Sequence, residues 1–111
     1  MAAILVADVV GSSRLIEADE AYALTAIRAE LHDVLIPNAA QHGGRLVKTM
    51  GDGTLLEFAS SASAVTCAVE VQKTLADRAA AEPEDRRVLL RIGVNLGDIV
   101  AHPDGDLLEP V

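Results

Sequence analysis

The feature that most constrains the fold is a short glycine turn that separates two apolar runs. The turn is Gly51-Asp52-Gly53, and the runs cover residues 45–50 and 54–59. An Asp-Gly pair between two such runs is the strongest short-range signal for a tight β-hairpin. The middle of the chain is therefore predicted to form two adjacent antiparallel strands, for which the rest of the sequence must supply neighbours.

A strand and a helix are predicted before the hairpin. Residues 3–10 form a nearly continuous run of mostly branched apolar residues, which is typical of a buried strand. Residues 19–36 are predicted to form a helix that Pro37 ends, because the apolar residues recur three and four positions apart. This apolar stripe consists of Leu24, Ile27, Leu31 and Leu35.

A helix and a strand are also predicted after the hairpin. Ser60, Ser61 and Ser63 offer N-caps for a helix that fades near residue 80. Apolar residues alternate over residues 88–95, which predicts a strand, and a further short strand is expected from residue 99. The apolar face expected for the helix consists of Val65, Ala68, Val69, Gln72 and Leu75, with Val71 nearby.

The order of these elements is strand, helix, strand, strand, helix, strand. This order predicts an α+β fold of the ferredoxin-like, or palm-type, βαββαβ arrangement, with an antiparallel sheet and two helices on one of its faces. In that arrangement the first strand lies beside the central hairpin. The end of the first strand and the tip of the hairpin are then expected at the same edge of the sheet.

Composition narrows the function classes. The length of 111 residues allows one domain. The formal net charge of −8 is unfavourable for non-specific binding to nucleic acid or anionic membranes, although a nucleotide could bind if a metal ion neutralised its phosphates. Cys67 is the only cysteine and is expected to be buried, which fits a reducing compartment. No apolar run reaches the ~18 residues that a membrane span needs, so we expect a cytoplasmic protein.

Two acidic residues are the first candidates for a functional site. Asp8 lies near the end of the first predicted strand and Asp52 in the hairpin turn, so the fold can bring them together. Two adjacent carboxylates repel unless a cation lies between them, and hard oxygen ligands favour Mg²⁺ or Mn²⁺. Two such ions can hold both oxygens of a phosphoryl displacement. Asp52 alone is equally well explained as a turn residue, whereas an acid in an apolar strand such as Asp8 is costly unless paired or metal-bound.

Two further features lie close to these acids. Gly11, Ser12 and Ser13 follow the first strand and lead toward a helix, where backbone N–H groups can bind an anion. The alternative is a plain turn between strand and helix. Lys48 is in the second predicted strand, on the same side as Leu46 and Met50 by simple alternation. Its alternative is a lysine at the sheet edge that keeps its charge in water.

Three segments together resemble one protein family. AILVADVVGSSRL, HGGRLVKTMGDGTLLEF and RIGVNLGDIV resemble the class III adenylate/guanylate cyclase catalytic domain, especially the bacterial soluble type, in the family's order. Residues 1–111 are accordingly expected to be part of one such domain. The resemblance implies an adenylate cyclase of intracellular signalling. Such an enzyme is a homodimer that converts ATP to 3′,5′-cyclic AMP and pyrophosphate with two Mg²⁺ or Mn²⁺ ions.

The resemblance also assigns roles to the candidate residues. Asp8 and Asp52 match the two metal-binding, catalytic aspartates, and Val9 matches a position whose backbone carbonyl also binds a metal. The remaining roles concern ATP. The phosphate loop of the family matches Gly11, Ser12 and Ser13. Lys48 matches the lysine that recognises adenine, which favours ATP over GTP because guanylate cyclases tend to carry an acid there.

Two departures from the family pattern stand out. The family often has an aromatic residue where this chain has Ser12, a change that leaves backbone donation intact. The family also continues with a segment that supplies an Asn and an Arg for catalysis, and the 111 residues do not contain it. The chain is therefore expected to be a truncated, N-terminal portion of the domain, with weak or no activity by itself.

Three other functions stay open on the sequence. The chain could be a non-catalytic cyclase-like module that pairs with another cyclase domain and regulates it. A diguanylate-cyclase-like domain is less favoured, because the hairpin lacks that family's Gly-Gly-Asp/Glu-Glu-Phe motif. A ferredoxin-like domain without an active site would follow if Asp8 and Asp52 lay at opposite ends of the sheet.

Overall fold

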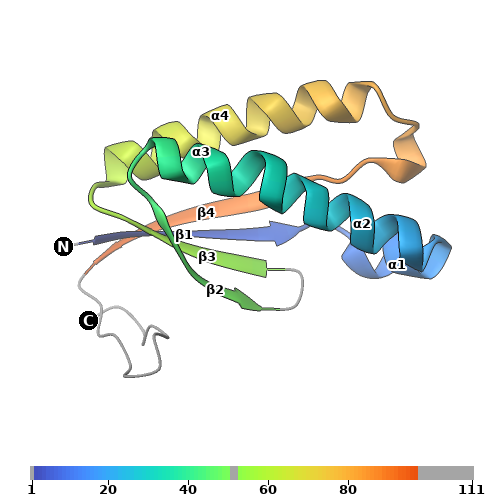
Figure 1. Cartoon of the computed structure of the whole chain (residues 1–111), viewed down its shortest axis with the longest axis horizontal. Helices are drawn as coiled ribbons and strands as arrows, with labels where there is room; N and C mark the ends of the chain where they lie inside the picture. Colours follow the sequence, from blue (N-terminus) through green and yellow to red (C-terminus); the bar gives the residue numbers. More distant parts are fainter. Residues whose placement is uncertain (1, 51–52, 98–111) are drawn as a thin grey trace.

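The computed structural model describes residues 2–50 and 53–97, and its elements follow the expected order (Figure 1). The main elements are β1 (Ala2–Val9), α1 (Ser12–Ala18), α2 (Glu20–Glu30), α3 (Ile36–Gln41), β2 (Arg45–Met50), β3 (Gly53–Phe58), α4 (Ser61–Ala80) and β4 (Leu90–Gly97). A π-helical turn (Leu31–Leu35) joins α2 to α3, and a 3-10 helix (Glu84–Arg86) lies between α4 and β4. The strand expected from residue 99 lies outside the described residues.

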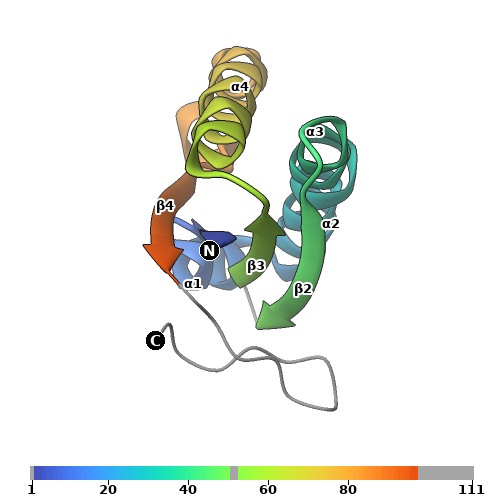
Figure 2. The same ribbon diagram turned by 90° about the vertical axis from the view of Figure 1, so that its left-hand side faces the viewer.

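The strands form one antiparallel sheet in the order β2-β3-β1-β4. Figures 1 and 2 show α4 and the long helix formed by α2 and α3 side by side on one face of this sheet. The predicted α+β, ferredoxin-like arrangement is confirmed. β1 lies in the interior of the sheet, between the hairpin strand β3 and the last described strand, β4.

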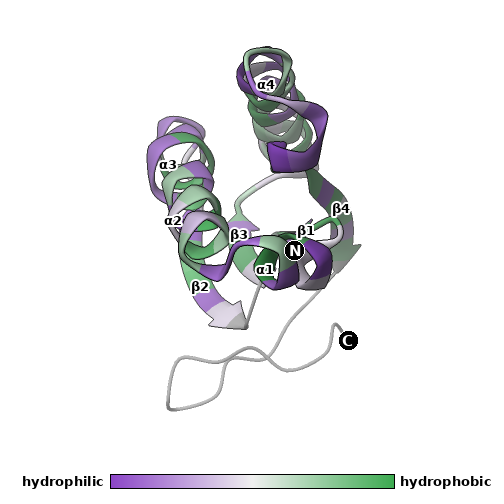
Figure 3. Cartoon of the chain, turned by 90° about the vertical axis from the view of Figure 1, so that its right-hand side faces the viewer, coloured by the Kyte–Doolittle hydropathy of each residue, from purple (hydrophilic) through white to green (hydrophobic). Residues whose placement is uncertain are grey.

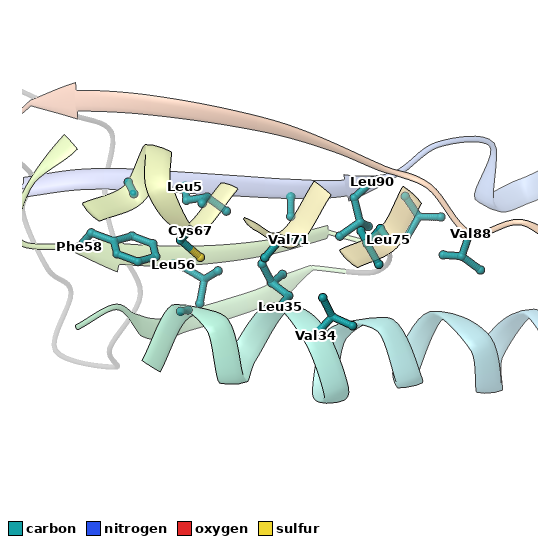
Figure 4. Close-up of a cluster of buried hydrophobic side chains, with 14 of the residues drawn as sticks. Leu5, Val34, Leu35, Leu56, Phe58, Cys67, Val71, Leu75, Val88 and Leu90 are labelled. Carbon is teal, nitrogen blue, oxygen red and sulfur yellow. The ribbon is translucent and has the colours of Figure 1, made fainter. Parts of the chain in front are cut away.

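The core lies between the sheet and these helices and is almost entirely aliphatic (Figure 4). Phe58 is the only phenylalanine of the chain and is 1% exposed. The predicted burial of Cys67 is confirmed, and this burial raises the pKa of its thiol to about 11. Among residues 2–50 and 53–97, no helix combines the length and the apolar character that crossing a bilayer requires.

The prediction that Pro37 ends the first long helix is wrong. The chain stays helical through Pro37 to Gln41, because a π-helical turn ends two residues before the proline. In this turn the Ile36 N–H donates to the Leu31 carbonyl, five residues back. A proline inside a regular helix would remove a hydrogen bond and collide with the preceding turn, and the wider turn offers a place where that conflict is relieved.

The π-helical turn also shifts the apolar stripe of this helix. Ile27 and Leu35 are buried as predicted, but Leu24 is 47% exposed. The buried residues are Ala23 and Ile27 before the turn and Val34, Leu35 and Ala39 after it. The extra residue in the turn rotates the helix face that contacts the sheet, which a regular spacing of three and four cannot anticipate.

The apolar face predicted for α4 is wrong at two positions. Ser60 caps the helix as expected, and its side chain accepts from the Ser63 N–H at 3.1 Å. Val65 and Val69, however, are about half exposed. The buried face instead consists of Ala64, Cys67, Val71 and Leu75. Gln72 is held toward the sheet by a hydrogen bond, because its amide donates to the Leu90 carbonyl of β4 at 2.8 Å.

Candidate active site

Asp8 lies at the end of β1, on the sheet face directed away from α2, α3 and α4. Burial along β1 alternates there, with Ala7 and Val9 in the core and Asp8 between them only partly buried. The side chain of Asp8 is 37% exposed. In the sheet register Asp8 pairs with Gly53 of β3 on one side and Arg91 of β4 on the other. The carboxylate therefore occupies an accessible position at the end of a strand whose other face is buried.

Arg91 is the main partner of Asp8. Its Nη2 donates to Asp8 Oδ2 at 2.9 Å, although 73% of the Arg91 side chain is exposed. Sequence reasoning did not single out Arg91. The available signal was its place between the apolar residues Leu90 and Ile92, which puts it on the opposite face of its strand. Only the sheet register shows that this face is shared with Asp8.

Asp52 lies outside the described residues, so its approach to Asp8 stays a prediction. The neighbouring residue in the chain is Gly53, which pairs with Asp8 across β1 and β3 and with Met50 across the hairpin. The hairpin therefore meets the same end of the sheet as Asp8. This arrangement removes the geometric objection that the end of β1 and the hairpin lie at opposite ends.

The predicted phosphate loop is the start of a helix. Gly11 is the N-cap of α1, and its φ of 65° lies in the left-handed region that favours glycine. Its carbonyl accepts from the N–H groups of Arg14 and Leu15. Ser12 and Ser13 form the first turn of α1, the part of a helix whose N–H groups suit an anion. The carbonyl role predicted for Val9 is not tested by these observations.

Lys48 is exposed on β2, but not on the side expected. A bulge between Leu46 and Lys48 pairs Leu46 with Leu56 and Lys48 with Leu55. Successive residues of β3 point to opposite faces, so Leu46 and Lys48 do not share a face. The irregularity instead puts Lys48 on the face of Asp8, two strands and two residues away, which is roughly 12 Å along the sheet.

A divalent ion fits the donor chemistry of Asp8, although the described residues do not form a complete metal site. Asp8 offers a hard carboxylate oxygen, and its partner in β3 is a glycine without a side chain to cover it. No group of three or more His, Cys, Asp or Glu in the described part of the chain could hold a metal. A complete site therefore needs further ligands, for which Asp52 and the Val9 carbonyl are the predicted candidates.

Comparison with known proteins identifies the family of the chain. The family model described as the adenylate and guanylate cyclase catalytic domain matches residues 1–108. The chain belongs to this family. The resemblance inferred from the three sequence segments is thereby confirmed.

Individual relatives point to the same family. A protein of Rhizobium meliloti (strain 1021) that is assigned by name as an adenylate cyclase is 49% identical over 107 residues, which is 96% of this chain and 18% of that protein. The crystal structure of an adenylate/guanylate cyclase/hydrolase from Silicibacter pomeroyi is 41% identical in sequence. The match has a TM-score of 0.88 and covers 97% of this chain and 62% of that one. The structure of a bacterial light-regulated adenylyl cyclase shares the fold, with a TM-score of 0.81 over 91% of this chain and 55% of that one. Its sequence is 15% identical.

Proposed function

We propose that this chain is the metal- and ATP-binding part of an adenylate cyclase that forms 3′,5′-cyclic AMP and pyrophosphate. The observation that carries the proposal is the pairing of Asp8 with Gly53, because it brings the hairpin that contains Asp52 to the end of β1. Family membership supports the reaction class. The choice of ATP rests on Lys48 and on the name of the Rhizobium meliloti relative.

The proposed ion-binding residues are Asp8, Asp52 and the carbonyl of Val9. Bound Mg²⁺ or Mn²⁺ ions would stabilise the triphosphate charge and make the ribose 3′-hydroxyl easier to deprotonate. Asp8 must first give up part of its contact with Arg91. The guanidinium of Arg91 is then free to contact the phosphates beside Asp8, a role that suits its planar set of donors.

The remaining residues orient the nucleotide. Gly11, Ser12 and Ser13 are proposed to donate backbone N–H groups to the phosphates from the start of α1. Lys48 is proposed to contact the adenine. Because it lies roughly 12 Å from Asp8 along the sheet, the two residues of one protomer do not meet around a small ion. This separation is compatible with a homodimer in which each nucleotide contacts Asp8 of one protomer and Lys48 of its partner.

Ion-dependent ATP binding is the direct test. Calorimetry of the 111-residue chain should detect ATP binding with Mn²⁺ and little without it. Asp8→Asn and Asp52→Asn should each weaken that binding by about tenfold or more, since each removes a charged ligand. Asp77→Asn on the exposed side of α4 is the matched control and should have no effect. Equal affinities in all four proteins would refute the proposed site.

Turnover is the secondary test. The catalytic Asn and Arg implied by the resemblance are not among the 111 residues, so we expect these residues by themselves to form little cyclic AMP. Mixing the chain with an intact cyclase domain then separates two functions. If the mixture forms more cyclic AMP with Mn²⁺ and Asp8→Asn abolishes this gain, the chain takes part in catalysis. If the chain changes the rate of the intact domain and Asp8→Asn does not affect that change, the chain is a regulatory module.

A further inference from the structure

The connector between α4 and β4, residues 81–89, has few apolar contacts over its first part. Residues 81–87 are all exposed, and the chain that follows α4 is largely hydrophilic (Figure 3). Open surface pockets of about 360, 350 and 130 Å³ border the connector. A segment with little apolar burial has low local stability. Its position therefore depends on a few specific contacts.

Val88 anchors the end of the connector in the core, and the contacts of its exposed part come mainly from Tyr22, near the start of α2. The Tyr22 hydroxyl donates to the Arg86 carbonyl at 2.7 Å, and the Arg86 guanidinium lies 4.4 Å from the centre of the Tyr22 ring. Asp19 adds an oxygen 3.7 Å from Arg86 Nη2 and also accepts from the Tyr22 N–H as the cap of α2. We call these three residues, Asp19, Tyr22 and Arg86, the Tyr22 latch.

The other end of the connector touches the candidate active site. The Leu89 carbonyl accepts from the Val10 N–H at 2.9 Å, and Val10 directly precedes the Gly11 cap of α1. Two residues after Leu89, Arg91 contacts Asp8. A change in the position of the connector would therefore reach the Gly11 turn and the start of β4 together.

We propose that Tyr22 is a positioning residue: by holding Arg86, it fixes the connector and, through the Val10–Leu89 bond, the turn at Gly11. The consequence for nucleotide binding rests on the proposed function. The mechanical coupling between Tyr22 and Val10 does not, because every contact in it lies within the described structure.

Hydrogen exchange of single amides tests the coupling. Tyr22→Phe keeps the ring and its contact with the guanidinium but removes the hydroxyl donor. We expect the Val10 amide to exchange about two- to tenfold faster in this variant, the range expected for the loss of one hydrogen bond. The Leu5 amide, in the middle of β1, should keep its rate. Thr25→Ala, on an exposed part of α2, is the control and should change neither rate.

A second variant keeps the test decisive if Tyr22→Phe folds poorly. Arg86→Ala removes the contacts with the Tyr22 ring and with Asp19 but leaves the backbone carbonyl. It should also accelerate hydrogen exchange of the Val10 amide without affecting the Leu5 amide. An unchanged Val10 rate in both variants would overturn the proposal. Equal acceleration of Val10 and Leu5 would overturn it as well, because Tyr22 would then act only on global stability.

Ligand binding separates this inference from the proposed function. In Tyr22→Phe, the affinity for ATP in the presence of Mn²⁺ should fall several-fold, while the affinity for Mn²⁺ alone should not change. If the unaltered chain shows no Mn²⁺-dependent ATP binding, the proposed function fails, yet the exchange result still decides whether the coupling exists. If the unaltered chain binds ATP and Tyr22→Phe binds it equally well, the Tyr22 latch does not position the turn at Gly11 for the nucleotide.

Discussion

Asp8 and Arg91 face each other across β1 and β4, with Oδ2 and Nη2 2.9 Å apart. With 37% of the Asp8 side chain and 73% of the Arg91 side chain exposed, water screens the attraction, and such pairs contribute about 0.2–1 kcal/mol. A divalent ion with additional ligands can overcome an interaction of this size. Arg91 is therefore a weak competitor for Asp8 and a nearby cation for any phosphate bound there.

Replacing Arg91 should affect the ion and the nucleotide in opposite directions. Arg91→Gln removes the competing cation, so Mn²⁺ should bind the chain up to about fivefold more tightly, the limit set by an exposed ion pair. ATP in the presence of Mn²⁺ should bind more weakly, because the proposed contact between Arg91 and the phosphates is lost. Calorimetry measures both affinities, with Arg28→Gln on α2 as the control. A parallel change of the two affinities would contradict the dual role.

Charge reversal at Lys48 should change base selectivity. Lys48→Glu exchanges a donor for an acceptor, and we expect the ratio of ATP to GTP affinity to fall by about tenfold, comparable to one hydrogen bond to a charged group. The ratio is informative because the added negative charge weakens the binding of both triphosphates to a similar extent. The measurement is competition between the two nucleotides with Mn²⁺ in the proposed dimer. Lys73→Glu, exposed on α4, should leave the ratio unchanged, and an unchanged ratio in Lys48→Glu would remove its role in base recognition.

Gly44 should tolerate no side chain. A Cβ at this position would lie 2.4 Å from Cε2 of Phe58, whose ring is buried in the core. Gly44→Ala should lower the free energy of unfolding by about 1–3 kcal/mol, as overpacking does elsewhere. Urea denaturation followed by circular dichroism gives this value. Gly93→Ala, where a Cβ meets nothing within 4 Å, should change stability by no more than about 0.5 kcal/mol, and similar losses at both sites would contradict the packing described.

Cys67 should make the fold sensitive to alkaline pH. Burial is the main cause that raises the pKa of its thiol from 9.0 to about 11, and the nearby Glu70 adds to it. The folded state keeps the proton while the unfolded state loses it, so stability is full below pH 9 and falls as pH rises toward 11. The loss should be about 2–3 kcal/mol. Urea denaturation of the chain and of Cys67→Ala at several pH values measures it.

The same burial governs the reactivity of Cys67. A thiol reagent attacks the thiolate, which a buried thiol with a raised pKa rarely forms. Labelling at pH 8 should therefore be slow in buffer and fast in denaturing urea. Fast labelling of the folded chain, or identical pH profiles for the chain and Cys67→Ala, would show that the thiol is not buried as described.

Local signals were sufficient for much of the fold. The Asp-Gly turn and the run at residues 3–10 depend on short-range preferences, and the four described strands form within two residues of the predicted bounds. Ser60 caps α4 because a cap is formed by residues close in the chain. The same holds for Asp8 as a candidate, since an acid in an apolar strand stands out without any knowledge of its neighbours.

The errors arose where something other than the regular helix period decided which residues are buried. Leu24 lies outside the buried stripe because the π-helical turn changes the helix phase before Pro37. Val65 and Val69 are exposed because the position of the sheet, and not the helix pattern, selects the face of α4 that is buried. A periodic pattern indicates that a helix has an apolar side. It does not specify which of several neighbouring helix faces packs against the sheet.

The candidate site divides in the same way. Residue chemistry and chain order were enough to select Asp8, Lys48 and the turn after β1 and to indicate a cyclase. Three relationships became evident only in the folded chain. They are the pairing of Asp8 with Arg91, the bulge that turns Lys48 to the face of Asp8, and the contact of Tyr22 with Arg86. The register of a sheet and the docking of a connector depend on residues far apart in sequence, and a single chain carries no local signal for them.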